Sequence, residues 1–464
     1  MKKYLFFTAI LLTIYFMVAA FNTADFDLWH RLAAGKLFFK LGHVPQTDIF
    51  AYTQTKDLWI DHEWGSGVIF YFIENNFGLA GLSFLKLVLL FATFLPVFLM
   101  NRLRTEEPGK YRILFYIIFL YTILFGFLYT IRSHCFTYAF FAWWIYLIEL
   151  VKRGNRKLLW LFPPMTVIWA NLHGGFLAGL GLLLMSGFPV TAAISGLFTI
   201  INPYGIKYWE YLTGAVTMER TFIPEWQPLD LFGPFNIALG FKIFLLMTII
   251  ALPHIFKNKK WSELLILAVT CYLSLKHIRH NVFFVIASAA YMGEYFFPKK
   301  IFPRLEFFKD VLIYSIIFIV GILTVHFVPL KLKTDTFPVK SVKFIKKNNL
   351  SGNLLVLFNW GGYALWNLYP QCLVSIDGRY EEVYPESLVN ESARFHYVGK
   401  DWKDLMNKYK TDLMLIDTSY PVFQELLTHD DWKVIYQDKI SAVFMPTSKA
   451  IYFKNASEIP SIKN

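Results

Sequence analysis

The sequence predicts a polytopic α-helical membrane protein with a C-terminal α/β domain outside the membrane. Three observations support this fold class. The chain of 464 residues is 56% hydrophobic and 19% aromatic, which is too apolar for a soluble protein of this size. Its basic residues cluster in short segments between apolar runs. After residue 333 the apolar density falls, and the pattern changes to alternating strands and helices.

The basic clusters set the predicted orientation, because short loops rich in Lys and Arg stay in the cytoplasm. They lie at residues 2–3, 102–112, 152–157, 257–260 and 299–309. We therefore expect a protein of the bacterial cytoplasmic (inner) membrane, with its N-terminus inside and its C-terminal domain outside. Much of the net charge of +12 lies in these loops, where it meets anionic membrane lipid. No nucleic-acid partner is predicted.

The apolar runs predict about eleven membrane-spanning helices. The first, at residues 4–21, exceeds a typical signal-peptide core and is predicted to stay uncleaved. Residues 174–201 are predicted to cross twice, with a turn near 187–189, because the basic segments on both sides must lie inside. The other spans are predicted near residues 80–101, 112–131, 135–151, 158–171, 235–256, 261–275, 281–297 and 311–332. The transmembrane domain is thus residues 1–332, with a large outside loop at 22–79.

This outside loop begins with a pair of carboxylates, Asp25 and Asp27. The leucine spacing of residues 27–41 predicts a helix lying in the membrane interface, with Arg31 among its basic residues. Two carboxylates so close together suit general-base catalysis or, alternatively, a divalent cation such as Mg²⁺ or Mn²⁺. The alternative for Asp27 is a cap on the helix that follows.

The same loop contains His62 and Glu63 between Trp59 and Trp64. His62 and Glu63 suit acid–base chemistry or metal ligation, and Trp64 offers a stacking surface for a sugar. A membrane-interface belt also explains the tryptophans, but it does not explain the histidine and the glutamate.

Further polar residues lie at the predicted outside ends of the spans. Arg132 and Arg279 run against the positive-inside trend, which predicts that they bind a phosphate. Snorkelling to lipid headgroups is the alternative. The remaining substrate-binding candidates in the outside segments are His30, His134, Asn171, His173, Glu225 and His277.

The C-terminal domain, residues 333–464, is predicted to be a small α/β domain. Strands are predicted at residues 354–358, 372–376, 412–416, 432–437 and 441–445, and helices at 338–349, 361–369, 385–395, 400–409 and 421–428. Residues 359–363 (NWGGY) permit a close backbone approach to a ligand. Asp377 and Arg379 end a strand, where α/β sheets often bind ligands; a turn held by an Asp–Arg contact is the alternative. The three cysteines show no paired spacing, so neither a zinc site nor a disulfide is predicted.

Several motifs together carry a resemblance to a known group of proteins. They are residues 25–30 (DFDLWH), 59–64, 171–175 (NLHGG), 202–205 (NPYG), 225–226, 359–363 and 376–379 (IDGR). These motifs resemble uncharacterised bacterial multi-pass membrane proteins related to the GT-C superfamily of glycosyltransferases. The resemblance covers most of the chain. It implies a GT-C-like transmembrane fold, and a polyprenyl-phosphate-linked sugar as donor.

The resemblance also implies an acidic catalytic base or metal ligand in the first outside loop, a role that falls on Asp25 or Asp27, with Glu63 and Glu225 also available. Such a carboxylate would take a proton from the acceptor hydroxyl, while cations stabilise the departing lipid phosphate. We expect the acceptor to be a glycan, lipid or protein of the cell envelope.

The competing class is a non-enzymatic lipid-linked glycan transporter or assembly protein. A transporter carries polar groups at mid-membrane depth, whereas the polar residues here collect on the predicted outer face. A glycan polymerase or ligase would use the same residues as single-sugar transfer.

Overall fold

The computed structural model describes residues 10, 12–15, 22–105, 111–124, 126, 131–218, 223–233, 238–296 and 330–451. The chain forms two compact units. The helical unit comprises residues 1–22 and 76–330, and the α/β unit comprises residues 23–75 and 331–464. The predicted domain boundary after residue 332 lies close to the observed one. The prediction, however, assigned residues 22–79 to the transmembrane domain, whereas Thr23–Asn75 belong to the α/β unit.

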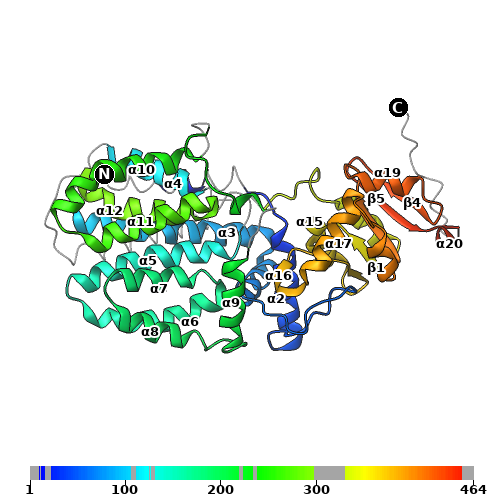
Figure 1. The fold of residues 1–464 in the computed structure, drawn as a ribbon, viewed down its shortest axis with the longest axis horizontal. Coiled ribbons are helices and arrows are strands. Elements are labelled where there is room, and N and C mark those ends of the chain that lie inside the picture. Colours follow the sequence, from blue (N-terminus) through cyan, green and yellow to red (C-terminus); the bar gives the residue numbers. More distant parts are fainter. Residues whose placement is uncertain are drawn as a thin grey trace. The chain divides into compact units, whose positions relative to one another are not determined.

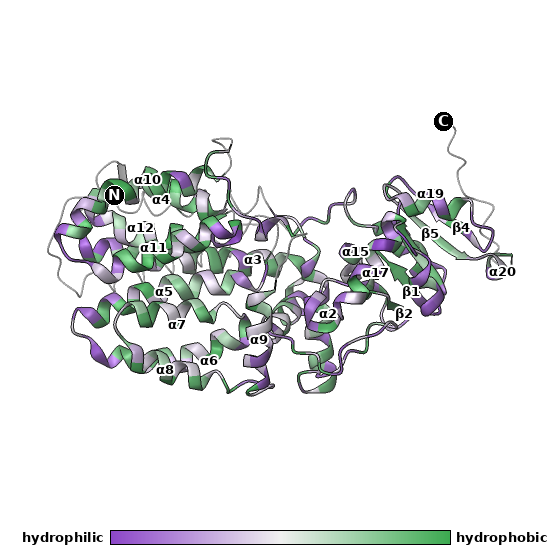
Figure 2. Ribbon diagram, viewed as in Figure 1, coloured by the Kyte–Doolittle hydropathy of each residue, from purple (hydrophilic) through white to green (hydrophobic). Residues whose placement is uncertain are grey.

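The helical unit is built of helices (Figure 1) that fall within most of the predicted apolar segments. Hydrophobic residues dominate helices such as α5, α7 and α10 (Figure 2). The helices are α3 (Trp64–Arg104), α4 (Tyr111–Leu124), α5 (His134–Lys152), α6 (Phe162–Leu172), α7 (Phe176–Met185), α8 (Pro189–Phe198), α9 (Lys207–Thr217), α10 (Leu239–Lys257), α11 (Trp261–Lys276) and α12 (Asn281–Phe296), with 3₁₀ turns η2 (Arg156–Leu161), η3 (Pro224–Trp226) and η4 (Ile278–His280). Most of predicted span 4–21 and nearly all of span 311–332 lie outside the described residues.

Among the described residues, three helices are long and apolar enough to cross a membrane, namely α3, α5 and α10. The predicted turn near residues 187–189 is present between α7 and α8. Each of these two helices has ten residues, which is about 15 Å at 1.5 Å per residue and half of a bilayer core of about 30 Å. Neither α7 nor α8 is therefore long enough for the full crossing that the sequence predicted.

Gly78 divides α3 into two helical segments. Its backbone has φ 61° and ψ −166°, a conformation that only glycine adopts readily. The residues before this kink up to Asn75 belong to the α/β unit, and those from Asn76 onward belong to the helical unit. Residues 79–104, about 39 Å long, contain the predicted span 80–101.

Arg104 joins four helices of the helical unit through buried ion pairs. Its guanidinium lies 2.5 Å from Glu149 of α5, 2.9 Å from Glu263 of α11 and 3.2 Å from Glu294 of α12. Lys260 also pairs with Glu294. Arg104 belongs to the basic cluster at 102–112, which the sequence explained by topology alone. Because a buried charge without a partner is costly, this network fixes the four helix ends against one another.

The α/β unit contains a five-stranded sheet in the order β2-β1-β3-β5-β4. Strand β1 is parallel to β2 and β3, while β5 is antiparallel to β3 and β4. All five predicted strands and all five predicted helices are confirmed, with shifted ends. The elements are α2 (Asp27–Leu41), α14 (Val339–Lys347), β1 (Gly352–Val356), α15 (Phe358–Leu368), β2 (Cys372–Val374), α16 (Tyr380–Val383), α17 (Glu386–Tyr397), α18 (Asp404–Lys408), β3 (Leu413–Asp417), α19 (Pro421–Leu427), β4 (Trp432–Gln437), β5 (Ser441–Pro446) and α20 (Thr447–Ala450).

Helix α2 has the predicted bounds, but most of it is buried in protein rather than presented to a membrane interface. All residues from Leu28 to Gly35 are buried, and α2 packs on α15. The glycines of residues 359–363 allow α15 to approach both α2 and the chain beyond β2 closely. A Cβ on Gly361 would lie 1.9 Å from the Ile376 carbonyl oxygen, and one on Gly362 would lie 3.3 Å from the Phe26 carbonyl oxygen. The motif therefore serves helix packing, and the predicted ligand approach at these glycines is wrong.

Arg379 ties residues 22–79, which the sequence predicts to be an outside loop, to the sheet. It is 1% exposed, binds Asp377 through two hydrogen bonds of 2.9 and 2.6 Å, and forms an ion pair with Asp48 of the loop. Its guanidinium lies over the rings of Phe50 and Trp59, with 5.0 and 4.8 Å to their centroids. Asp377 and Arg379 were predicted to bind substrate. Their complete burial in this ion pair contradicts that role and supports the structural alternative.

We expect Arg379→Met to destabilise the α/β unit by about 3–5 kcal/mol, because it leaves Asp48 and Asp377 buried without their cation. Thermal unfolding of the full chain in detergent measures the effect. Arg394→Met is the matched control, since Arg394 is exposed on α17. Equal unfolding temperatures for the two variants would contradict the structural role of Arg379.

Candidate functional site

The carboxylates that open the first outside loop have different roles in the structure. Asp25 is buried, and its Oδ1 accepts a hydrogen bond of 3.1 Å from the backbone N–H of Asp27. Asp25 therefore supports the start of α2, the role that the sequence considered for Asp27. Asp27 is the first residue of α2 and is half-buried. Its Oδ1 lies 3.4 Å from the position that a Cβ on Gly378 would occupy.

His30 lies beside the same glycine. Its Cε1 and Nδ1 atoms are 2.9 Å from the Cβ position of Gly378, and its Nδ1 has no hydrogen-bond partner among the described residues. Burial, together with the charge of Arg31, lowers the pKa of His30 to about 4, so the ring is neutral at pH 7. Asp27 and His30 thus meet the chain just beyond β2, at the carboxyl end where parallel sheets often bind ligands.

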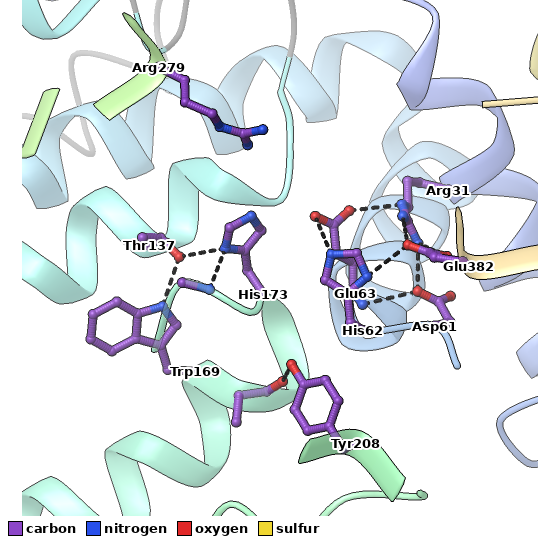
Figure 3. Close-up of polar contacts among 12 residues, drawn as sticks. Arg31, Asp61, His62, Glu63, Thr137, Trp169, His173, Tyr208, Arg279 and Glu382 are labelled. Carbon is purple, nitrogen blue, oxygen red and sulfur yellow. Dashed lines mark hydrogen bonds and ion pairs between the residues drawn. The ribbon is translucent and has the colours of Figure 1, made fainter. Parts of the chain in front are cut away.

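A second group in the α/β unit surrounds Arg31, and we call it the Arg31 cluster: Arg31, Asp61, His62, Glu63 and Glu382. Arg31 lies 2.5 Å from Asp61, 2.9 Å from Glu63 and 2.5 Å from Glu382. His62 Nδ1 lies 2.8 Å from Glu382. Figure 3 shows these side chains directed toward one another. Glu63 and His62, predicted as catalytic and substrate-binding residues, are therefore held in ion pairs, with side chains 16% and 19% exposed.

The charges of the Arg31 cluster do not balance, since three carboxylates surround one guanidinium. Burial opposes the ionisation of Glu382, but Arg31 and His62 outweigh it and lower the pKa of Glu382 to about 2. Burial raises the pKa of Asp61 to about 6, against the attraction of Arg31. Burial also opposes protonation of His62, but Glu382 outweighs it and raises the pKa of His62. Below about pH 6, protons on Asp61 and His62 therefore relieve part of the excess negative charge.

In the helical unit, Arg132 and Arg279 approach one carboxylate, that of Glu225. We call Arg132, Glu225, Trp226 and Arg279 the Arg279 cluster. Arg132 Nη1 lies 3.3 and 3.5 Å from the two oxygens of Glu225, and Arg279 Nη1 lies 3.5 Å from one of them. The Arg279 guanidinium stacks on Trp226, 4.4 Å from the ring centroid. The side chains are 27% (Arg132), 24% (Arg279) and 38% (Glu225) exposed.

The predicted histidines of the helical unit lie near this cluster or support it. His277 Nδ1 lies 2.6 Å from the carbonyl oxygen of Trp226. The rings of His134 and His173 are 6.4 Å apart, and His134 Nε2 lies 2.8 Å from the carbonyl oxygen of Gly126.

The tautomer of His173 is fixed by its neighbours. The backbone N–H of Gly175 donates to His173 Nδ1 over 2.8 Å, and Thr137 Oγ1 lies 3.0 Å from the same nitrogen. Trp169 Nε1 donates to Thr137 Oγ1 (Figure 3). Because Nδ1 accepts, neutral His173 carries its proton on Nε2.

Two other predicted residues have structural contacts. Asn171 Nδ2 donates to the carbonyl oxygens of Val167 and Ile201, which links α6 to the segment after α8. Trp64 begins α3, and its ring lies 5.8 Å from that of Phe38. Neither contact tests the predicted role in substrate binding.

Sequence reasoning missed Asp61 and Glu382, and it interpreted Arg31 as part of an interfacial helix. A signal was available for Arg31, since a basic residue in a predicted outside loop runs against the positive-inside trend.

Among the described residues, no group of three His, Cys, Asp or Glu side chains is arranged to hold a metal ion. With Asp25 engaged at the start of α2, the donor set of Asp25 and Asp27 does not fit the divalent cation considered from the sequence.

No known protein-family model matches the chain, and no curated protein matches it either. The likeness to GT-C enzymes therefore stays a prediction based on the motifs.

From the pKa shifts in the Arg31 cluster we predict that the stability of the protein depends on pH. The folded state raises the pKa of Asp61 from 3.8 to about 6, so it favours the protonated form. This contribution is complete below pH 4 and is lost as the pH rises through 6. The raised pKa of His62 acts in the same direction at higher pH. Asp61 and His62 should thus make the unfolding temperature fall between pH 5 and pH 7, against the opposite contribution of His30, whose pKa is lowered to about 4.

Asp61→Asn should flatten this fall, because asparagine does not titrate. The control is Asp430→Asn, which replaces an exposed aspartate of the α/β unit and should keep the wild-type pH profile. The check is the unfolding temperature of the full chain at each pH. A wild-type slope that persists in Asp61→Asn would assign the pH dependence to other groups.

Proposed function

We propose that this protein is a membrane glycosyltransferase that transfers a sugar from a polyprenyl-phosphate-linked donor to an acceptor on the outer face of the cytoplasmic membrane. One observation carries the proposal: two guanidiniums converge on a single, partly exposed carboxylate beside a tryptophan, in a unit built of apolar helices. The group retains a net positive charge. Such a site suits a phosphate attached to a hydrophobic chain.

In this reaction the bond between the sugar carbon and the donor phosphate oxygen breaks, and a bond from that carbon to the acceptor oxygen forms. Negative charge develops on the departing lipid phosphate, and Arg132 and Arg279 supply the compensating positive charge. Arginine suits this role because its planar fork can hold two phosphate oxygens at once.

The acceptor hydroxyl must lose its proton to a base, and Asp27 is the proposed base, as the sequence suggests. Asp25 is engaged at the start of α2, and Glu63 is paired with Arg31. The half-buried Asp27 is the first residue of α2, in the segment where the resemblance implies the base. The proton would pass from the acceptor oxygen to a carboxylate oxygen of Asp27.

The proposed orientation places the N-terminus inside and the α/β unit outside, as the sequence predicts from its basic clusters. Reporter fusions after Lys157 and Lys260 should give a cytoplasmic signal, and fusions after Gly205 and Lys333 an exterior one. A cytoplasmic signal at Gly205 would overturn the assignment of both polar groups to the outer face.

The donor class is tested by native mass spectrometry of the purified protein. We expect a polyprenyl phosphate or a lipid-linked sugar to co-purify, because the Arg279 cluster lies in an apolar unit. Repeated recovery of ordinary phospholipid alone, from cells that make lipid-linked sugars, would contradict the proposed donor.

Asp27→Asn should lower the rate of transfer from that lipid by about 10²–10⁴-fold, the usual contribution of a positioned general base. Membrane expression should be unchanged, because asparagine keeps the size of the side chain. Asp57→Asn replaces an exposed aspartate of the same loop and should retain activity. If the Asp27→Asn variant transfers the sugar at the wild-type rate, Asp27 is not the base, and Glu63 becomes the next candidate.

A further inference from the structure

We infer that the Glu225 side chain occupies the place of the donor phosphate when the protein is empty, and that the phosphate displaces it from Arg132 and Arg279. This inference rests on the proposed function. It makes Glu225 an internal competitor of the substrate rather than a residue that binds it, the role that the sequence suggested.

The distances show that the arginines hold Glu225 weakly. Both arginines approach it at 3.3–3.5 Å, whereas charge-assisted hydrogen bonds are about 2.7–2.9 Å long. In the same protein, the buried Arg31–Glu382 and Arg104–Glu149 pairs reach 2.5 Å. The guanidiniums of the Arg279 cluster therefore have capacity for stronger acceptors than this carboxylate.

Because the side chains of this cluster are partly exposed to solvent, displacing Glu225 costs little free energy. The Glu225 side chain is 38% exposed, and those of Arg132 and Arg279 are 27% and 24% exposed. Ion pairs this accessible to solvent contribute little to stability. A carboxylate released from such a pair regains water, in contrast to the buried carboxylates of the Arg31 cluster.

Hydrogen bonds hold the backbone that follows Glu225, and we assign the movement to the Glu225 side chain. The Gln227 carbonyl oxygen accepts a hydrogen bond of 3.0 Å from the N–H of Ile278, and the N–H of Leu229 donates over 3.0 Å to Leu275. These bonds attach the segment after η3 to α11 and η4. Arg279 remains stacked on Trp226, which keeps its guanidinium in place while the carboxylate rotates away.

The charges of the cluster and of the phosphate favour the exchange of Glu225 for phosphate as the reaction proceeds. With Glu225 in place, two arginines and one carboxylate leave a single net positive charge. The donor phosphodiester carries one negative charge, but the departing phosphate monoester carries about 1.5–2 at pH 7. Two arginines released from Glu225 match this larger charge. Displacement therefore strengthens binding most for the leaving group, as selective stabilisation of the transition state requires.

The test is the affinity of the full chain in detergent for a polyprenyl monophosphate, measured by native mass spectrometry titration. Glu225→Gln keeps the size of the side chain and removes the competing charge, so it should bind several-fold more tightly than the wild type. Glu210→Gln is the matched control, since Glu210 is exposed on α9 of the same unit, and it should bind like the wild type. Arg279→Gln should bind more weakly.

The outcomes separate the two proposals. If the wild type binds and both Arg279→Gln and Glu225→Gln bind more weakly, Glu225 holds the arginines in place; the displacement is then wrong, while the proposed function stands. If neither the wild type nor Glu225→Gln binds the lipid, both proposals fail. A parallel titration with inorganic phosphate identifies the source of the affinity. Binding of inorganic phosphate with no gain from the lipid chain would overturn the lipid assignment.

Discussion

Burial of Arg31 and Arg379 is the constraint on which the α/β unit depends. A guanidinium removed from water must be surrounded by carboxylates, and here those carboxylates come from segments far apart in the chain. Arg31 on α2 pairs with Glu382, and Arg379 pairs with Asp48. Residues 23–75 and the C-terminal segment consequently fold as one unit. The same pairing brings Asp27 and His30 to Gly378 at the end of β2.

The arginine clusters differ mainly in how far their side chains are exposed to solvent. Arg31 and Arg104 make short ion pairs with buried carboxylates, and removal of either partner would leave an uncompensated charge. Arg279 makes a long contact with a carboxylate that solvent reaches. Buried networks of this kind hold elements together, whereas an accessible cation with a weakly held partner can exchange it for a ligand. This contrast leads us to place the proposed phosphate site at Arg279.

Close packing of small residues complements these ion pairs. A Cβ on Gly35 would lie 2.1 Å from the carbonyl oxygen of Gly67, and one on Gly362 would lie 3.3 Å from the backbone nitrogen of His30 in α2. These contacts let α2 lie between the start of α3 and α15. The position of Asp27 thus depends on both arginine pairing and glycine packing, and a larger residue at Gly362 would disturb the proposed base without touching it.

The sequence by itself determined the elements: residues 27–41 form the predicted helix, and all five predicted strands are present. Hydrophobic periodicity reports which face of an element is buried, and this information is local. Tertiary structure decided the partners. Arg31 and Glu382 are 351 residues apart, so no local pattern could identify them as partners in a buried ion pair. Likewise, the helical backbone at Phe26 made Asp25, rather than Asp27, the residue that supports α2, because hydrogen-bond geometry depends on the folded path of the chain.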